Sequence, residues 1–357
     1  MAAHHPGSAG DSDPELPTFS DGPRRAALVA ILAALLLTAA FAMTRGAFDI
    51  DMGAVYRTVK SHIWAPAATG QVSALHDTIV WKLRLPRILL AMSVGMALAA
   101  SGAVFQGCFR NPLVEPYILG VSYAAAFGAA LAIAFPLYVL SVRMSAFLFG
   151  IAAVASACGL GRVRGRTPVV ALVLAGVIIG SLFMAMVSIL KYVASDAALR
   201  EIVFWLMGGF YYAAWSDVYI VTPVVLVCIF LEWHLGWKLN VVSMGSEEAR
   251  AMGVHPEKYR AILIALATLS TTISVSSVGV IAWVGLMAPH ATRMIIGSDN
   301  RFVIPAAAMV GGIYLLVCDT VARTLVSAEI PIGIITAILG APYLIYLLRA
   351  KGASLAE

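Results

Sequence analysis

Long apolar runs alternate with short polar segments from Ala26 to Leu348. Each run can cross a bilayer as an α-helix, which needs roughly 20 predominantly apolar residues. The runs are continuous and do not alternate with a period of two, unlike the strands of a membrane β-barrel. The pattern predicts about ten spans, at residues 26–44, 87–107, 116–135, 141–160, 168–192, 215–235, 259–277, 279–295, 304–322 and 332–348.

The composition agrees with this pattern. Hydrophobic residues make up 61% of the 357 residues and charged residues only 12%. A soluble domain of this length could not bury so much apolar surface, whereas a bilayer accepts it if every backbone polar group is paired within a helix. The chain is therefore predicted to be an all-α polytopic membrane protein.

Basic residues are spread unevenly over the connecting segments and indicate the orientation. With the N-terminus in the cytoplasm, the inner ends of the spans hold 14 of the 24 Lys and Arg residues, the Arg162–Arg166 cluster and the Lys238–Arg260 loop among them. The positive-inside rule then predicts that both termini are cytoplasmic. The same residues form no continuous basic patch, so no nucleic-acid partner is expected despite the net charge of +5.

Residues 1–23 are polar, acidic and rich in Gly, Ser and Pro, a composition typical of a disordered tail. The next apolar run could be a cleavable signal peptide, because Ala40-Phe41-Ala42 has the form of a cleavage site. The acidic leader and the length of the run favour a retained first span. We therefore expect a cytoplasmic tail at 1–23 and a ten-helix domain at 24–350 with an outer loop at 45–86.

Several chemistries have no signature in this sequence. It contains no GxxxxGK[ST] phosphate loop, so the chain is not expected to be an ATPase or another enzyme. The four cysteines lie far apart without metal-binding spacing, so no metal, catalytic residue or cofactor is expected. Glu115, Glu232 and Asp319 stand near span ends and form no midplane relay, which counts against proton-coupled transport.

Two polar segments flank the second span. Before it stands Arg84-Leu85-Pro86-Arg87, whose arginines could extend toward lipid headgroups or bind an acidic partner. After it, Pro112 and Pro116 end one helix and begin the next, which predicts a rigid turn at the inner face. Small residues on both sides permit close helix packing, so this turn could narrow a pathway or could serve packing alone.

The stretch 243–254 is the most polar segment between spans. Its serine and two glutamates predict a short capped helix that ends at a glycine, and Pro256 predicts the start of a second short helix. Ala249 and Met252 are three residues apart and are expected to share a face that enters a partner's cleft. The expected contact residues are Ser246, Glu247, Glu248, Ala249, Arg250, Met252 and Gly253.

In order and spacing, these segments resemble the permease subunits of ABC importers for vitamin B12, ferric siderophores and haem. The resemblance covers nearly all of the chain after residue 80. It implies ten helices per subunit, a homodimer with the pathway on its two-fold axis, two cytoplasmic ABC ATPases that bind ATP and Mg²⁺, and a periplasmic or lipid-anchored substrate-binding protein. The segments that carry it are Arg84–Arg87, Gly102–Ser122, Leu172–Gly176, Phe204–Gly209, Glu247–Val254, Gly279–His290, Asp319–Arg323 and Glu329–Pro342.

The resemblance also implies roles for individual residues. Arg84, Arg87 and Arg323 would dock the binding protein, and residues 240–258 would form the coupling helices that contact the ATPase. An inner gate would include Asn111 and Leu113, with Thr167 and Pro168 near a second gate. The stretch around these two residues aligns loosely and departs from the family's small hydroxyl residues, so the second gate rests on a looser match.

The resemblance further implies transport across the bacterial or archaeal inner membrane. The expected substrate is an iron complex, either a siderophore or haem, or a corrinoid, although some family members carry oxyanions. Tyr56, His62 and His76 in the outer segment are the residues that could indicate haem. The alternative function is a stand-alone secondary transporter of a small solute.

Overall fold

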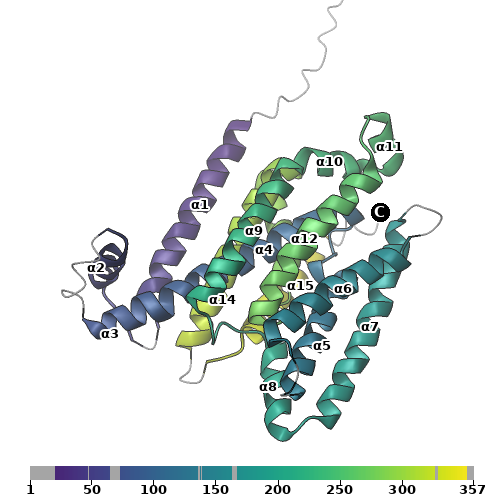
Figure 1. Ribbon diagram of the computed structural model, residues 1–357. Helices are drawn as coiled ribbons and strands as arrows, with labels where there is room; N and C mark the ends of the chain where they lie inside the picture. The colour runs from purple at the N-terminus through teal and green to yellow at the C-terminus, as the bar shows by residue number, and fades with distance from the viewer. Residues whose placement is uncertain are drawn as a thin grey trace, which may run out of the picture.

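The computed structural model describes residues 21–46, 48–64, 73–135, 137, 139–162, 167–325 and 329–351, and all regular structure within these ranges is helical (Figure 1). This confirms the predicted all-α class. The helices are α1 (Asp21–Thr44), α2 (Met52–Ile63), α3 (Ala74–His76), the π-helical η2 (Asp77–Arg84), α4 (Leu85–Phe109), the 3₁₀ turn η3 (Pro116–Leu119), α5 (Val121–Ala134), α6 (Val142–Leu160), α7 (Val169–Val193), α8 (Asp196–Met207), α9 (Trp215–His234), α10 (Gly236–Met244), α11 (Ser246–Ala251), α12 (Pro256–Val278), α13 (Val284–Ile296), α14 (Asn300–Thr324) and α15 (Ile332–Lys351).

Every predicted span overlaps a helix of the structure, although the eighth begins five residues before α13 and the third includes both η3 and α5. Among the described residues, seven helices are long and apolar enough to cross a membrane: α1, the continuous Ala74–Phe109, α6, α7, α9, α12 and α14. The apolar helices Val121–Ala134 and Ile332–Ile345 are shorter. The short helix α8 lies between the fifth and sixth predicted spans.

Three expectations about connecting segments are wrong. The outer segment 45–86 is not a loop, because α2, α3 and η2 occupy much of it and η2 continues directly into α4. Pro256 does not begin a second short helix but occupies the first turn of the long α12. Residues 21–23 of the expected tail are helical in α1, and residues 1–20 lie outside the described residues.

Helix α4 forms the centre of the bundle and packs against α9, α12, α13 and α14. Small residues allow this, because a Cβ atom on Gly102 would stand 1.9 Å from the carbonyl oxygen of Gly285 in α13. A Cβ on Gly95 would stand 2.3 Å from the Gly311 carbonyl of α14. The backbones therefore touch directly, as expected where van der Waals packing, and not the hydrophobic effect, holds helices together in lipid.

Contacts between distant segments define the two ends of the bundle. At one end, the start of α1 approaches the start of α14 through Arg24 and Asp299, and Gly107 of α4 meets Leu239 of α10. At the other end, the start of α4 meets the end of α14 through Arg87 and Asp319. The predicted inner ends thus gather at the first end and the predicted outer ends at the second, hereafter the α10 end and the α2 end.

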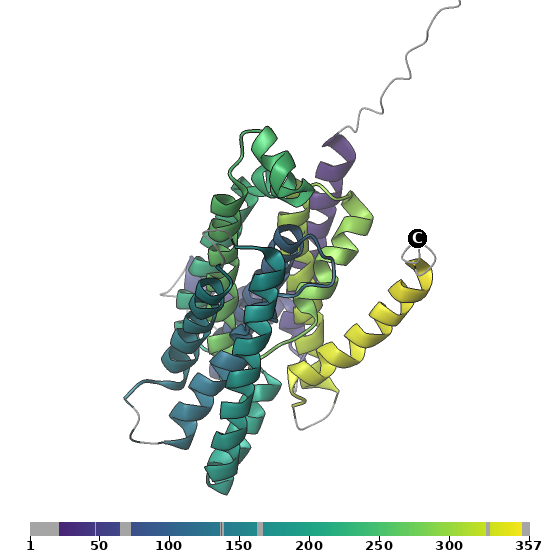
Figure 2. The same cartoon turned by 90° about the vertical axis from the view of Figure 1, so that its right-hand side faces the viewer.

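Helix α15 stands apart from this arrangement. Figure 2 shows that it diverges from the other helices along its length. Its apolar residues Ile338 and Ile345 are 62% and 58% exposed. This helix therefore has an apolar surface that the described part of the chain does not cover.

Candidate functional site

The three outer arginines lie together at the α2 end, but intrachain contacts engage each of them. Arg84 is 6% exposed and donates from Nη1 to the Met43 carbonyl at 2.8 Å and from Nη2 to the Phe48 carbonyl. Arg323 donates to the carbonyls of Arg45 and Ala42, both at 2.8 Å. These bonds fasten the end of α1 and the segment after it onto η2 and α14.

Arg87 belongs to a buried charge network at the same end. Its Nε donates to Asp319 at 2.9 Å and its Nη1 to Glu329 at 2.9 Å, while Arg323 Nε lies 3.3 Å from Asp319. Asp319 is fully buried, so the guanidinium groups of Arg87 and Arg323 share one carboxylate that has no contact with solvent. Docking of a binding protein by the three arginines stays a prediction. In this conformation a partner's carboxylates would have to displace the intrachain bonds of these arginines, and Arg84 is the least exposed of the three.

One of the two histidines of the outer segment, His62, also makes intrachain contacts. His62 stacks on Trp81 at 4.1 Å between ring centroids, and its Nε2 lies 3.2 Å from Asp77. Trp81 in turn contacts Trp215 of α9, with the ring centroids 5.1 Å apart and the rings tilted by 41°. This aromatic series fixes α2 on η2, so His62 contributes to packing and is not positioned as a haem ligand.

The turn after α4 is rigid, as its prolines predict. Arg110 adopts a left-handed conformation with φ 52°, and the N–H groups of Arg110 and Asn111 bond back to the carbonyls of Gly107 and Gln106. This is a Schellman closure with an arginine where glycine is usual, a backbone conformation that costs about 1–2 kcal/mol in a residue with a Cβ. Asn111 Oδ1 then accepts from the Leu113 N–H at 2.9 Å.

Leu113 projects from this turn and lines a cavity of about 470 Å³. The side chain is 72% exposed, so the cavity opens to the surface of the subunit. Its other lining residues are Glu115, Tyr117, Ile118, Ser122, Tyr123, Ala126, Leu206, Val280 and Ala282, which belong to the turn, α5, α8 and the segment before α13. We call this the gate cavity.

Glu115 links the turn to the segment before α13. Its carboxylate accepts a hydrogen bond from the backbone N–H of Trp283, and burial raises the pKa of this carboxyl group more than that bond lowers it. Trp283 has φ 77°, a second left-handed non-glycine residue beside the same cavity. Strained backbone of this kind persists where the surroundings fix it, often at functional sites. Trp283 was not expected as a site residue, because its backbone geometry leaves no trace in the sequence.

Thr167 and Pro168 do not belong to the gate cavity. Thr167 lines a separate cavity of about 310 Å³ between α6, α7 and α12, together with Glu257 and Arg260. Pro168 is the N-cap residue of α7 and is exposed. Among the described residues, the structure therefore separates the two expected gates into different cavities.

Helix α11 is short, and its C-terminal closure is the one predicted. Gly253 has φ 72°, and the N–H groups of Gly253 and Val254 bond to the carbonyls of Arg250 and Ala249, which completes a Schellman motif. The predicted cap at the other end is wrong: Ser246 is the first helical residue, Gly245 is the N-cap, and no side chain caps the helix.

The expected contact face of α11 is also wrong. Ala249 is fully buried in a cluster with Val241, Val242 and Val254, whereas Met252 is 49% exposed. Met252 follows the last helical residue, so the three-residue spacing does not put both side chains on one face. Glu247 and Glu248 are exposed, and Arg250 bridges Glu247 at 2.8 Å to Glu257 of α12. The outward surface of α11 is therefore mainly charged, with Met252 at its edge.

A hydrogen-bonded latch connects α10 to the start of α14, and sequence reasoning missed it. Asn240 donates to Asp299 at 2.7 Å and accepts from the backbone and side-chain nitrogens of Asn300 at 2.8 and 2.9 Å. Asp299 also accepts from Arg301. Burial raises the pKa of the Asp299 carboxyl group, but the bonds from Arg301 and Asn240 outweigh it and bring the pKa to about 2. We call these residues the α10–α14 latch.

The arrangement is that of a polytopic helical membrane protein with a cavity open to the surface of the subunit and with the short helix α11, hereafter the projection, at the α10 end. The chain belongs to the FecCD transport family, whose model matches residues 31–350. It is therefore a multi-pass membrane permease of the ABC importer type, which decides against a stand-alone secondary transporter. Permeases of this kind work with ATPase and substrate-binding partners.

Relatives and a solved structure agree with this assignment. The chain is 37% identical over 322 residues to the molybdate import system permease protein MolB of Haemophilus influenzae, which covers 89% of this chain and 94% of that protein. It is 42% identical over 276 residues to the cobalamin import system permease protein BtuC of Halobacterium salinarum, covering 77% and 74%. It is 39% identical over 277 residues to the hemin transport system permease protein HmuU of Yersinia pestis, covering 75% and 83%.

One similar solved structure is described as an inward-facing conformation of a metal-chelate type ABC transporter. It shares 35% identity and a TM-score of 0.81, with 91% of this chain and 99% of that chain covered. The relatives carry chemically different substrates, so similarity alone assigns no substrate to this chain.

Proposed function

We propose that two copies of this chain form the membrane pore of an importer for a metal chelate, either an iron complex or a corrinoid. The gate cavity carries this proposal. It contains two tyrosines, a serine, apolar side chains and one carboxylate, and none of its lining residues is cationic. An oxyanion such as molybdate would meet a carboxylate without a compensating positive charge, whereas a bulky chelate suits a mainly apolar wall.

The second copy would close the open side of the gate cavity. Leu113 and Tyr123 are 72% and 46% exposed at its mouth, and α15 exposes an apolar surface that needs a neighbour. A two-fold axis through this face would put the pathway between the subunits. All ten predicted helices would then cross or enter the membrane, with both termini and the α10 end in the cytoplasm.

Helix α11 would receive the force of the ATPase. It is closed by Gly253, anchored by Ala249 and bridged to α12 by Arg250, so it moves as one body with α10 and α12. Its charged surface and Met252 would contact the ATPase. ATP binding and hydrolysis on the partner would bias the bundle between inward- and outward-open packings.

Substrate uptake into proteoliposomes that contain the complete importer would test the substrate. Uptake of a labelled iron–siderophore complex, labelled haem or labelled cobalamin would be measured alone and with each of the others added unlabelled, and molybdate uptake would be measured for comparison. ATP-dependent uptake of a chelate supports the proposal, and uptake of molybdate alone contradicts it. A Leu113→Cys variant tests the dimer separately, since a cross-link to the second copy should form in one nucleotide state and not in another.

A further inference from the structure

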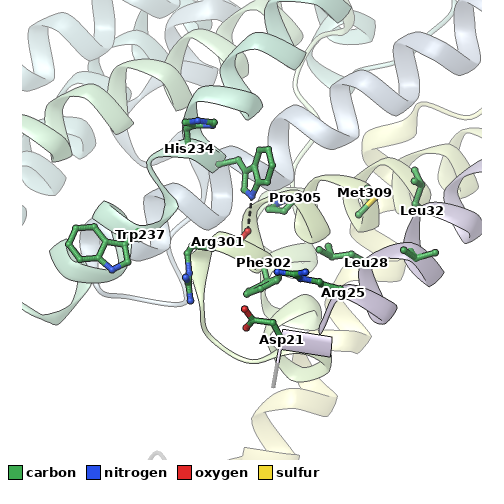
Figure 3. A pocket seen from close by; sticks show the side chains of 12 residues that line it. Asp21, Arg25, Leu28, Leu32, His234, Trp237, Arg301, Phe302, Pro305 and Met309 are labelled. Atoms are coloured by element: carbon green, nitrogen blue, oxygen red, sulfur yellow. Dashed lines mark hydrogen bonds between the residues drawn. The ribbon is translucent and has the colours of Figure 1, made fainter. Parts of the chain in front are cut away.

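A groove at the α10 end lies outside the machinery described so far. It has a volume of about 730 Å³ and runs between α1, α9, the start of α10 and α14. Figure 3 shows Asp21, Arg25 and Arg301 around Phe302 at one end, and Leu28, Leu32 and Met309 toward the other. The groove is therefore amphipathic along its length, polar at the end of the bundle and apolar toward its middle.

The groove faces the lipid surroundings of the subunit. Val29 and Leu32 of α1 are 67% and 45% exposed, and the indole side chains of Trp233 and Trp237 are 46% and 42% exposed. Tryptophan is enriched where the hydrocarbon core meets the headgroups. Trp233 is held in place, since its Nε1 donates to the Arg301 carbonyl at 2.9 Å. The polar end of the groove thus lies at headgroup level.

The charged residues at this end include Arg25, an arginine without an ion pair among the described residues. Asp299 is paired with Arg301 at 2.7 Å and approached by Arg24 at 3.8 Å, and Asp21 is approached by Arg24 at 3.9 Å. Arg25 lines the groove, is exposed, and has no ion pair or hydrogen bond to another residue of the described ranges. The three arginines and two aspartates together carry a net charge of +1, and Lys238, whose Nζ lies 4.6 Å from the ring centroid of Trp237 in the groove wall, adds a further positive charge.

We propose that this groove binds one anionic phospholipid, with the phosphate on Arg25 beside Arg301 and an acyl chain along Leu28, Leu32 and Met309. A phospholipid combines the two properties that the groove presents, a negative head and an apolar chain. Juxtamembrane basic residues attract anionic lipid with about 1 kcal/mol each, which corresponds to about a fivefold change in affinity. The bound lipid would connect α1 to α9 and α14, because the groove wall comes from all three helices.

Native mass spectrometry of the full-length chain, purified in mild detergent with its accompanying subunits and titrated with phosphatidylglycerol, tests the proposal. Arg25→Gln should weaken the first binding event about fivefold. Val29→Trp, which fills the apolar part of the groove, should weaken it without altering charge. Arg162→Gln is the matched control, because Arg162 is an exposed arginine after α6 and does not line the groove.

Equal losses in Arg25→Gln and Arg162→Gln would mean general attraction between a basic surface and anionic lipid, and would overturn the proposal. Equal affinity of the unaltered chain for phosphatidylcholine and phosphatidylglycerol would also overturn it. A selective loss in Arg25→Gln and Val29→Trp, with thermal midpoints unchanged in lipid-free detergent, supports it.

Discussion

The α10–α14 latch offers the sharpest test of how the projection moves the bundle. Asn240→Ala removes three hydrogen bonds at once, at 2.7, 2.8 and 2.9 Å. The bond to the Asp299 carboxylate is worth about 1.5–3 kcal/mol and each of the other two about 1 kcal/mol. Asn300 is 4% exposed, so its nitrogens would lose their partner without gaining bulk water. A net loss of about 3 kcal/mol is expected, below the simple sum because neighbouring terms are not additive.

This loss should appear in two measurements. The thermal midpoint in detergent should fall by roughly 6 °C, taking about 2 °C per kcal/mol for a long chain. In proteoliposomes with the complete importer, substrate transported per ATP hydrolysed should fall more than ATPase activity itself, because α11 would move without carrying the start of α14. The latch should not respond to pH near neutrality: Asp299 has a depressed pKa of about 2, so its contribution is present above the ordinary value of 3.8 and is lost only as the pH falls toward 2.

Ser243→Ala provides the matched control for this prediction. Ser243 stands on the same helix, and its hydroxyl donates at 2.7 Å to the Asn240 carbonyl, a bond within α10 that does not reach α14. Its removal should cost no more than about 1 kcal/mol and leave coupling unchanged. If Asn240→Ala and Ser243→Ala show the same midpoint and the same transport per ATP, the latch does not transmit movement and the reasoning is refuted.

Three further predictions concern the fold and the projection. Gly102→Ala should destabilise the bundle by about 3 kcal/mol, since its Cβ would stand 1.9 Å from a backbone oxygen of α13. Gly159→Ala is the control in thermal unfolding, and it should be neutral or stabilising because a Cβ there would meet nothing within 4 Å. Asp319→Asn should cost about 3–5 kcal/mol, because it leaves two guanidinium groups buried beside a neutral amide; an unchanged midpoint would show that the network is solvated. Met252→Glu should keep the unaltered midpoint but reduce co-purification of the ATPase, whereas Ala249→Arg should lower the midpoint itself, because only Met252 is exposed.

The spans were predictable because lipid imposes a length and an apolar composition on each of them. Predicted and observed ends of the sixth span, 215–235 against Trp215–His234, differ by one residue. The start of α13 was harder to predict from the sequence, because the segment 279–283 is apolar but is not helical. An apolar composition indicates that a segment lies in the membrane. It does not indicate whether the backbone of that segment is helical or adopts an irregular conformation beside a cavity.

The errors at the projection have a common physical cause. The contact face of α11 was inferred from spacing within a single helix, but its orientation is set by α10, whose valines Val241 and Val242 take up Ala249. Likewise the partners of Arg84 are carbonyls of Met43 and Phe48, about 40 positions earlier in the chain. Local rules describe which side chains are neighbours on an element, and only packing between elements decides which of them remain free to meet a partner. The exposed charges and Met252, and not the buried Ala249, are therefore where the interaction with an ATPase should be sought.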